Sequence, residues 1–583
     1  MDKISKIGLG LTVLLLIGWF YWQSQQKKDE VLPPDRGRDA AEVALREEAP
    51  LSVKAPPVVT PATIIKEEAV VVPVAELAVE FPVDSTPVLI DTGLSLVRLN
   101  PFGGVIEELV LKENPDAGIR KLPDEGSGAV TLINAGNIDQ APGRLLNFPP
   151  VVMKAAKFAG GVEFSTTYDN EITVKKRYSF EDGSYSAQLD IVLRNDSDQI
   201  LKWESGPIFG CGAIHPIDKE DLLGVDIYDG DTMLRKKAPE VKIPGRINWL
   251  GLKTKYFVAI YKPIEQPASF FSIYGVEKST PAPKKAALGC ARGPGASPYE
   301  YLRADMIFPT LILKPGESKQ YSFDLYLGPA NYAILQEAGN DFERIVDFGI
   351  FGKIYLPQVL IWLLNWIYGI IGSYGWAIIF LTIIIKVVLW PLTHKSYASM
   401  GKMQKLQPQL AELKEKYKGD SKKIQAETMK LYKANGVNPM GGCLPMLLQM
   451  PILFALFTTL RNTILLRKAP FWIIPGKWIK DLSGPDVLMV LDKSYPIIGN
   501  HLNILPLLMG LSFFLQQKFT PTAGGGSAQS AQQQKMMATL MPVMFTFLFY
   551  SLPSGLNLYF MLSTFITIAQ QLVTTRMAEN KAA

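Results

Sequence analysis

The feature that most constrains the fold of this chain is a series of long uncharged stretches, most of them in its C-terminal half. A helix needs about 20 apolar residues to cross the hydrocarbon core of a bilayer, so gaps between charged residues locate candidate spans. The gaps run from residue 7 to 26, 354 to 385, 434 to 460, 494 to 517, and 536 to 575. The last gap is interrupted by Pro553, Ser554 and Gly555, so it fits two spans joined by a tight turn. We therefore expect six transmembrane helices.

The distribution of basic residues predicts how these spans are oriented. Residues 1–27 resemble an uncleaved membrane anchor, because Lys3 and Lys6 precede the apolar run and Trp19–Trp22 closes it without a small-residue cleavage site. Residues 393–440 contain ten lysines against four acidic residues. Basic loops remain in the cytoplasm. We therefore expect this loop and both termini to be cytoplasmic.

The N-terminal half has the composition of a soluble region. Residues 28–84 are rich in Pro, Ala, Val and Glu without a sustained period, which predicts a flexible linker. Residues 85–333 contain alternating runs, such as 171–180 and 185–193, separated by Gly-Gly, Asp-Gly and Asn-Asp turns. They predict a large extracytoplasmic all-β sandwich. In residues 334–355, apolar residues stand among charged ones, which fits either an interfacial amphipathic helix or an ordinary packed helix of the soluble domain.

The remaining residues divide into helical segments. We expect residues 356–392 to form the second transmembrane helix, residues 393–440 a cytoplasmic helical hairpin, and residues 441–578 the third to sixth transmembrane helices. Apolar residues recur every three or four positions from Met400 to Tyr417, and Ser421 can cap a second helix that ends at Asn435-Gly436. The outer face of this hairpin suits either docking of a ribosome or nascent chain, or simple solvation beside anionic headgroups. The candidate docking residues are Lys402, Lys405, Lys414, Lys416, Lys422 and Lys423.

One charge lies inside an apolar segment. Lys386 follows three isoleucines and precedes Trp390-Pro391. Burying such a charge costs on the order of 2.5 to 3.5 kcal/mol on insertion scales. Its stem could snorkel toward the cytoplasmic end near Lys395, or its ammonium could face a water-filled cavity in the bundle.

Neutral polar residues in the later spans favour a cavity. The amides of Gln449, Gln516 and Asn557 each need hydrogen-bond partners inside the membrane. Acidic residues are absent from the five C-terminal spans, although a proton or cation relay would normally need them. A single positive charge among neutral polar groups would instead attract acidic or polar passengers.

The sequence argues against several functional classes. The three histidines form no HExxH motif, and no Walker A sequence occurs, so we expect neither an enzyme nor an ATPase and no cofactor. The three cysteines lack a CxxC pair and predict no zinc site, while pairing of Cys211 with Cys290 stays open. A solute transporter or channel is the alternative function, but the inverted repeats and broken helices typical of transporters are not apparent.

Several motifs resemble one family. They are Trp390-Pro-Leu-Thr393, the segment 396–407 with Met400, Lys402 and Met403, Asn438-Pro-Met-Gly-Gly-Cys-Leu-Pro445, Gln449-Met-Pro-Ile452, Met541-Pro542 and Pro553-Ser-Gly-Leu556. Together they resemble the YidC insertases, which are related to mitochondrial oxidase-assembly and chloroplast Albino proteins. The similarity covers about residues 350–578, and the anchor with a large β domain is similar to the Gram-negative form.

The resemblance implies a membrane protein insertase and chaperone of the bacterial inner membrane. It implies a five-helix core around a hydrophilic groove that is open to the cytoplasm and lipid, and a periplasmic β-supersandwich similar to sugar-binding folds. Lys386 holds the position of the family's groove arginine, while Met450, Pro451 and Phe560 correspond to passenger contacts. The implied partners are nascent membrane proteins, the Sec translocon, the ribosome and membrane lipids, with no small-molecule substrate.

Overall fold

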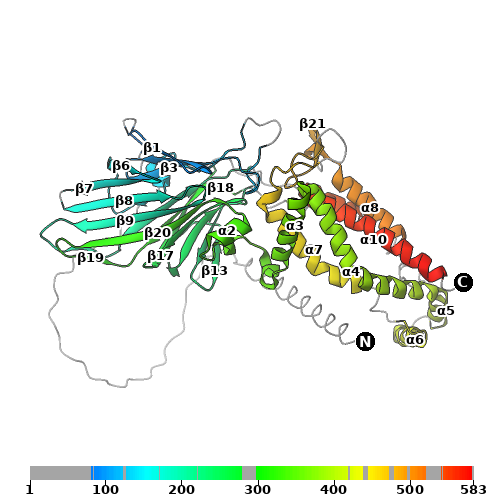
Figure 1. Cartoon of the computed structure of the whole chain (residues 1–583). Helices are drawn as coiled ribbons and strands as arrows, with labels where there is room; N and C mark the ends of the chain where they lie inside the picture. Colours follow the sequence, from blue (N-terminus) through cyan, green and yellow to red (C-terminus); the bar gives the residue numbers. More distant parts are fainter. Residues whose placement is uncertain are drawn as a thin grey trace, which may run out of the picture. The chain divides into compact units, whose positions relative to one another are not determined.

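The computed structural model describes an antiparallel β domain followed by apolar helices (Figure 1). The described residues are 80–82, 85–121, 127–169, 171–218, 221–278, 297–417, 420–437, 444–471, 478–495, 499–519, 540 and 542–580. The predicted anchor over 1–27 and almost all of the predicted linker over 28–84 lie outside them, as do Cys290 and Cys443.

Three sheets make up most of the β domain, and every strand pair in them is antiparallel. The first sheet has the order β1 (Val88–Asp91), β2 (Ser95–Asn100), β3 (Val105–Leu111) and β4 (Val130–Asn134). The second has the order β14 (Glu240–Ile247), β17 (Ala268–Glu277), β18 (Tyr299–Ile307), β11 (Ile208–Ile214) and β5 (Arg144–Leu145). The third has the order β13 (Met233–Lys236), β12 (Gly224–Tyr228), β15 (Trp249–Lys253), β16 (Phe257–Pro263), β20 (Ser318–Pro329), β9 (Ser186–Asn195), β8 (Ile172–Phe180), β7 (Gly161–Tyr168) and β6 (Lys154–Phe158). A short ribbon pairs β10 (Leu201–Trp203) with β19 (Leu311–Leu313).

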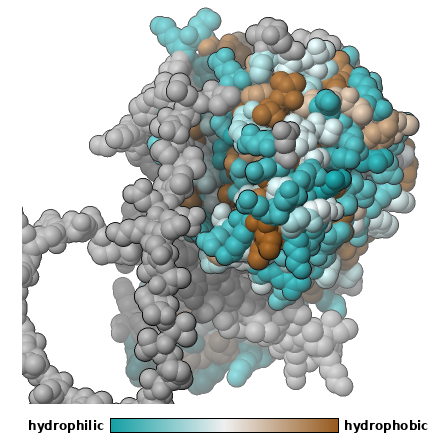
Figure 2. All heavy atoms as spheres, turned by 90° about the vertical axis from the view of Figure 1, so that its left-hand side faces the viewer, coloured by the Kyte–Doolittle hydropathy of each residue, from teal (hydrophilic) through white to brown (hydrophobic). Residues whose placement is uncertain are grey.

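The alternation in the sequence explains the core of this domain. In β9, Ala187, Leu189, Ile191 and Leu193 are buried, and the residues between them are more exposed. This strand pairs in continuous register with β8 and β20, so its apolar residues add to one buried face. The face of the domain seen in Figure 2 is mainly hydrophilic, with separate hydrophobic spots. The prediction of a large all-β domain is confirmed.

Residues 334–355 do not form the single helix, interfacial or packed on the soluble domain, that either interpretation of this segment expected. The segment instead contains the short helix α2 (Tyr332–Ala338) and two 3-10 turns, Phe342–Ile345 and Gly349–Ile354. Leu335, Phe342 and Ile345 are buried in the core of the β domain. Their apolar spacing therefore reflects packing against the sheet, which was the other interpretation of the same pattern.

The prediction of one transmembrane helix over residues 356–392 also needs correction. The structure has α3 (Leu356–Ile371) and a separate α4 (Tyr374–Lys405). Gly372 ends α3 in the left-handed conformation, with φ of 73°, and its N–H bonds to the carbonyl of Tyr368. Such a conformation favours glycine and terminates a helix. The rings of Tyr368 and Tyr374 then stack across the break with centroids 4.0 Å apart.

The C-terminal helices pack around α10 (Ser554–Asn580), which contacts α4, α7 (Leu444–Asn462) and α8 (Leu505–Phe519). Residues 542–549 are also helical, and a turn joins them to α10 at Pro553. Within the described residues, two helices are long and apolar enough to cross a membrane, over Tyr374–Met403 and Ser554–Thr574. α3 and α8 are apolar but shorter. The total of six spans therefore stays a prediction.

Residues 393–440 contain the end of α4 and a pair of helices, α5 (Gln407–Lys416) and α6 (Ser421–Ala434). Asp420, rather than Ser421, caps α6, because its carboxylate accepts the N–H of Lys423 at 3.1 Å. A small apolar cluster joins α6 to the end of α4 and the start of α5. Its buried members are Met403, Leu406, Tyr432 and Val437.

Candidate functional site

The predicted cationic residue Lys386 lies where α4, α7 and α10 meet. Its side chain is buried, with 5% of the residue exposed. The Nζ donates to Thr567 Oγ1 of α10 at 2.8 Å and to Gln449 Oε1 of α7 at 3.5 Å. The ammonium therefore points into the bundle, and snorkelling toward Lys395 is not the arrangement in the structure.

The partners that the structure describes for the charge of Lys386 are neutral. In the part of the chain that the structure describes, no carboxylate forms an ion pair with it. Gln449 Nε2 extends the polar network to Ser563 Oγ at 3.5 Å. A buried cation normally needs a countercharge or water, because hydrogen bonds to neutral groups only partly replace its hydration. The site thus favours an anionic or strongly polar visitor.

A stripe of buried polar residues continues from this point along α10. Its members recur at spacings of four, three and four, which places them on one face of the helix. They are Ser563, Thr567, Gln570 and Thr574. Gln570 Nε2 donates to the carbonyl of Lys386 at 3.3 Å, so the stripe faces α4.

A matching polar stripe lies on α4. Thr382, Lys386, Thr393 and Ser396 are all buried. The hydroxyls of Thr382 and Thr393 donate to carbonyls one turn earlier, which satisfies them within their own helix. These hydroxyl groups therefore allow α4 and α10 to pack along their polar stripes without leaving a donor unsatisfied. The two facing stripes are called the polar seam below. Gln570 and Ser396 were not among the predicted groove residues, although the helical spacing of the polar residues could have revealed them.

The other predicted contact residues lie at different depths in the bundle. Met450 and Pro451 follow Gln449 on α7 and are half-buried. Phe560 is half-buried on α10, and its ring packs edge-on against Phe549 with centroids 4.8 Å apart. It lies seven residues before Thr567, or about 10 Å along the helix, on the same face.

Asn557 has a different environment from the one expected. It is fully buried, and its amide donates to the carbonyls of Phe549 at 3.2 Å and Leu552 at 3.4 Å. These bonds hold the turn that precedes α10. Asn557 lies ten residues before Thr567, about 15 Å along the helix, and is therefore not part of the Lys386 network. Gln516 is half-buried on α8, which packs against α10.

The predicted docking lysines lie around α5 and α6. Lys402, Lys405, Lys416, Lys422 and Lys423 are exposed. The side chain of the sixth, Lys414, lies outside the described set. Among the described ion pairs, the Nζ of Lys423 lies 3.6 Å from the Oδ2 of Asp420. The cluster therefore presents a positive surface, which suits phosphate groups of either RNA or lipid.

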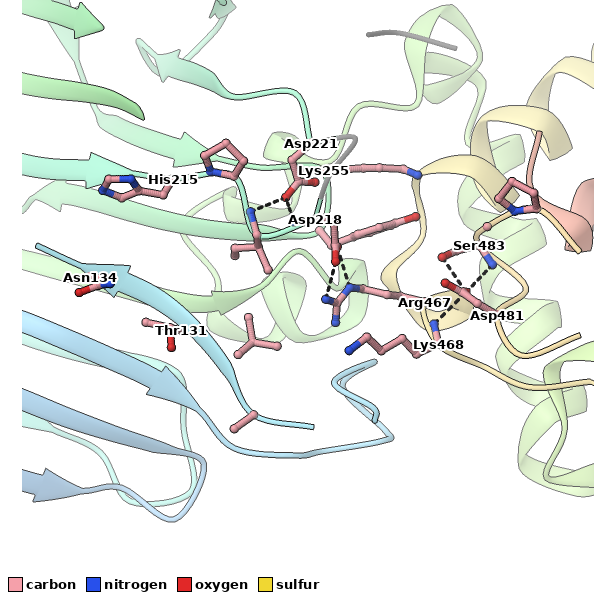
Figure 3. Close-up of a pocket in the computed structure, with 17 residues that line it drawn as sticks. Thr131, Asn134, His215, Asp218, Asp221, Lys255, Arg467, Lys468, Asp481 and Ser483 are labelled. Carbon is pink, nitrogen blue, oxygen red and sulfur yellow. Dashed lines mark hydrogen bonds and ion pairs between the residues drawn. The ribbon is translucent and has the colours of Figure 1, made fainter. Parts of the chain in front are cut away.

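A second polar site joins the β domain to the segment that follows α7 (Figure 3). Arg467 is 3% exposed, and its guanidinium donates two bonds of 2.9 Å to Asp218, which precedes β12 in the β domain. Arg120 Nη1 donates to the carbonyl of Leu465 at 2.7 Å. The adjoining cavity has a volume of about 740 Å³. Sequence reasoning missed this junction.

Burial changes the acidity of two carboxyl groups in the same segment. It raises the pKa of Asp481, which accepts the N–H groups of Lys468 and Ser483, and these bonds oppose the shift. Burial also raises the pKa of Asp486 to about 6, while bonds from the N–H groups of Ile504 and Leu505 oppose it. Both carboxylates thus organise backbone turns in the segment between α7 and α8.

Comparison with known proteins identifies the family. The family described as 60Kd inner membrane protein matches residues 366–581, and the YidC periplasmic domain matches residues 224–363. A relative from Syntrophus aciditrophicus, named membrane protein insertase YidC, is 33% identical over 86% of this chain and 88% of its own. One from Pelobacter propionicus with the same name is 34% identical over 85% and 87%.

Solved structures give a more distant similarity. A crystal structure titled as an active YidC insertase with the first transmembrane domain resolved is 18% identical, covers 85% of this chain and 94% of its own, and has a TM-score of 0.34. The family assignment rests on the sequence relatives, which align over most of both chains. The chain belongs to the YidC family of membrane protein insertases.

Proposed function

We propose that this protein inserts nascent proteins into the bacterial inner membrane by providing a hydrated, positively charged groove between α4, α7 and α10. The observation that carries the proposal is the buried ammonium of Lys386, whose partners are the neutral side chains of Thr567 and Gln449. A protein without covalent chemistry at this site can still lower the barrier for insertion. It acts as an insertase and chaperone, with no cofactor and no small-molecule substrate.

The barrier is the transfer of a polar passenger tail through hydrocarbon. Backbone N–H and C=O groups lose their hydrogen bonds to water there, at a cost of several kcal/mol for each unsatisfied group. A groove that holds water on the cytoplasmic side shortens the dry distance. Lys386 attracts an acidic tail to the end of the wet path, and burial of the passenger's apolar helix in lipid then drives release.

The passenger path follows the two helices that flank Lys386. Met450 and Pro451 on α7 and Phe560 on α10 are half-buried, so they can contact a helix that leaves the groove sideways. The large apolar side chains that α4 exposes, such as Val387 and Val388, contact lipid outside the groove. The groove therefore has a polar interior and an apolar exit.

The orientation follows from the charge of α5 and α6. Their exposed lysines favour a cytoplasmic position for this pair, which there docks the ribosome or an arriving nascent chain. The N-terminal anchor and the C-terminal tail are then also cytoplasmic, and the β domain is periplasmic. The protein acts alone or beside the Sec translocon, and lipids surround the six spans.

Site-specific crosslinking to a stalled nascent membrane protein tests this function. A photoreactive residue at Met450 or Phe560 is expected to capture the passenger's apolar helix, because both positions border the exit from the groove. The matched control is the same photoreactive residue at Val388, which is 70% exposed and lies on the side of α4 away from Lys386. It is expected to capture lipid. Equal capture of the passenger at all three positions would contradict a defined path.

A further inference from the structure

The segment between α7 and α8 contains a two-stranded ribbon with an unusual surface. β21 (Val487–Tyr495) pairs antiparallel with β22 (Gly499–Asn503). Three consecutive apolar residues of β21 are exposed: Leu488 by 47%, Met489 by 50% and Val490 by 62%. Because neighbouring side chains of a strand point to opposite faces, both faces of the ribbon expose apolar groups. An isolated two-stranded ribbon is only marginally stable in water, so this exposure needs a partner.

The base of the ribbon is fixed to the helical bundle. Asp486 is 1% exposed, and its Oδ2 accepts the N–H groups of Ile504 at 2.8 Å and Leu505 at 2.7 Å, where α8 begins. Asn503 donates from its side chain to the carbonyl of Tyr550 at 2.8 Å, and Tyr550 donates from its hydroxyl to the carbonyl of His501 at 2.8 Å. The ribbon is therefore held beside the start of α8 and the turn before α10.

Chain direction places this end of the bundle opposite the lysine-rich pair α5 and α6. That pair follows the C-terminal end of α4. α10 runs parallel to α4, since an added Cβ at Gly555 would contact Ile378 near the start of α4 and Gln570 bonds to Lys386 farther along. The ribbon thus lies at the noncytoplasmic end of the proposed spans.

The apolar residues of β21 lie beside the start of α8, because Val487 pairs with Asn503 and Met489 with Leu502, just before α8 begins at Leu505. Leu507 is 46% exposed, Leu511 53% and Phe514 51%, so α8 begins to expose large apolar side chains two residues after its start. Asp492 and Lys493, in the second half of β21, are exposed as well. A surface with apolar side chains next to the first lipid-facing turn, and charged groups farther along, matches the chemistry of a lipid headgroup layer.

We infer that the β21–β22 ribbon lies in the interface of the outer leaflet, with Leu488, Met489 and Val490 inserted among the lipid headgroups. Among the described residues no third strand pairs with the ribbon, and its strand edges exclude a deeper position because unpaired backbone groups are not tolerated in hydrocarbon. At headgroup depth, water and lipid oxygens satisfy these edges while the side chains reach the upper acyl region. The ribbon anchors the extracytoplasmic end of α8 and of α10 against the membrane surface. This inference rests on the proposed membrane location of the bundle.

Spin labels in nanodiscs test the inference with the full chain. Single cysteines at Met489 and Val490 are labelled after the three native cysteines are replaced by Ala or Ser. We expect the labels to be relaxed more strongly by oxygen than by a water-soluble nickel chelate, at a depth close to that of a label at Leu507. Ile312, an apolar residue of the β domain that is 53% exposed, is the water-facing control, and Phe514 is the deep lipid control.

Three other outcomes would overturn the inference. Nickel accessibility equal to that at Ile312 would place the ribbon in water. Low accessibility to both reagents would show that protein, such as a second copy or another segment, covers it. A depth equal to that at Phe514 would place it in the hydrocarbon core. If labels at Leu507 and Phe514 do not contact lipid either, the proposed membrane location of the bundle is wrong. If those two labels contact lipid and the labels at Met489 and Val490 do not, the inference about the ribbon alone is wrong.

Discussion

Lys386→Ala is expected to slow the insertion of passengers with acidic tails by on the order of 100-fold. Without the ammonium of Lys386, the acidic charge of the passenger is uncompensated, and such a charge costs roughly 2.5 to 3.5 kcal/mol in a membrane helix. The alanine removes the only described cation of the polar seam and leaves Thr567 and Gln449 to bond to water. The measurement is the insertion rate of one passenger into proteoliposomes, with its tail carrying acidic or neutral residues.

Two controls separate the charge from the fold. Lys386→Arg keeps the positive charge and should insert both passengers normally. Thr567→Val removes one neutral partner of Lys386 at nearly constant volume and should have a much smaller effect than the alanine. If Lys386→Ala inserts acidic tails as fast as the unchanged protein, the buried ammonium has no role in attracting passengers.

Asp218→Ala is expected to destabilise the protein by up to about 3 to 5 kcal/mol, because it removes the ion-pair partner of the buried Arg467 guanidinium and leaves the weaker attraction of Asp481. Arg467 is 3% exposed and donates to both oxygens of Asp218. Thermal unfolding of the detergent-solubilised full chain measures the loss. The midpoint temperature of unfolding should fall. Proteolysis at the junction between the β domain and the bundle should become faster, since Asp218 and Arg467 join these two parts.

The matched control for this ion pair lies on the surface. Lys112 and Asp91 form a pair whose side chains are 39% and 58% exposed. Asp91→Ala should therefore lower the unfolding midpoint much less than Asp218→Ala does, as for other exposed pairs. Arg467→Met keeps an apolar stem near Phe257 and leaves only the partly exposed Asp218 unpaired, so it should cost less than Asp218→Ala. Equal effects of the buried and surface variants would show that the junction is not held by this pair.

The sequence predicted the features that depend on a local alternation of apolar and polar residues, or on one charged residue inside an apolar run. Alternating apolar and polar residues predicted β9, because every second side chain of this strand is buried on the same face of the sheet. The charge of Lys386 marked the site, because a cation in an apolar run has few physical explanations. The same pattern could not distinguish packing on a sheet from packing on a membrane, which is why residues 334–355 stayed ambiguous until the contacts of Phe342 were known.

Other features depend on tertiary contacts or on local conformations that a count of charges does not detect. The uncharged run from 354 to 385 suggested one span, but Gly372 divides it by adopting positive φ. Asn557 was expected in the groove because its amide needs partners, and it finds them in the backbone of its own turn. Asp218 and Arg467 are far apart in sequence, so no period or motif connects them.

Thiol accessibility in intact membranes tests whether a water-filled groove lies beside Lys386. Cysteines at Gln449 and Ser563 are exposed to a membrane-impermeant maleimide from the cytoplasmic side, with a cysteine at Val388 as the lipid-facing control. Maleimide reacts with the thiolate, which forms only where water is present. Labelling is expected at residues 449 and 563, which face the groove, and no labelling at residue 388. Absence of labelling at 449 and 563, with normal labelling after unfolding in detergent, would contradict it.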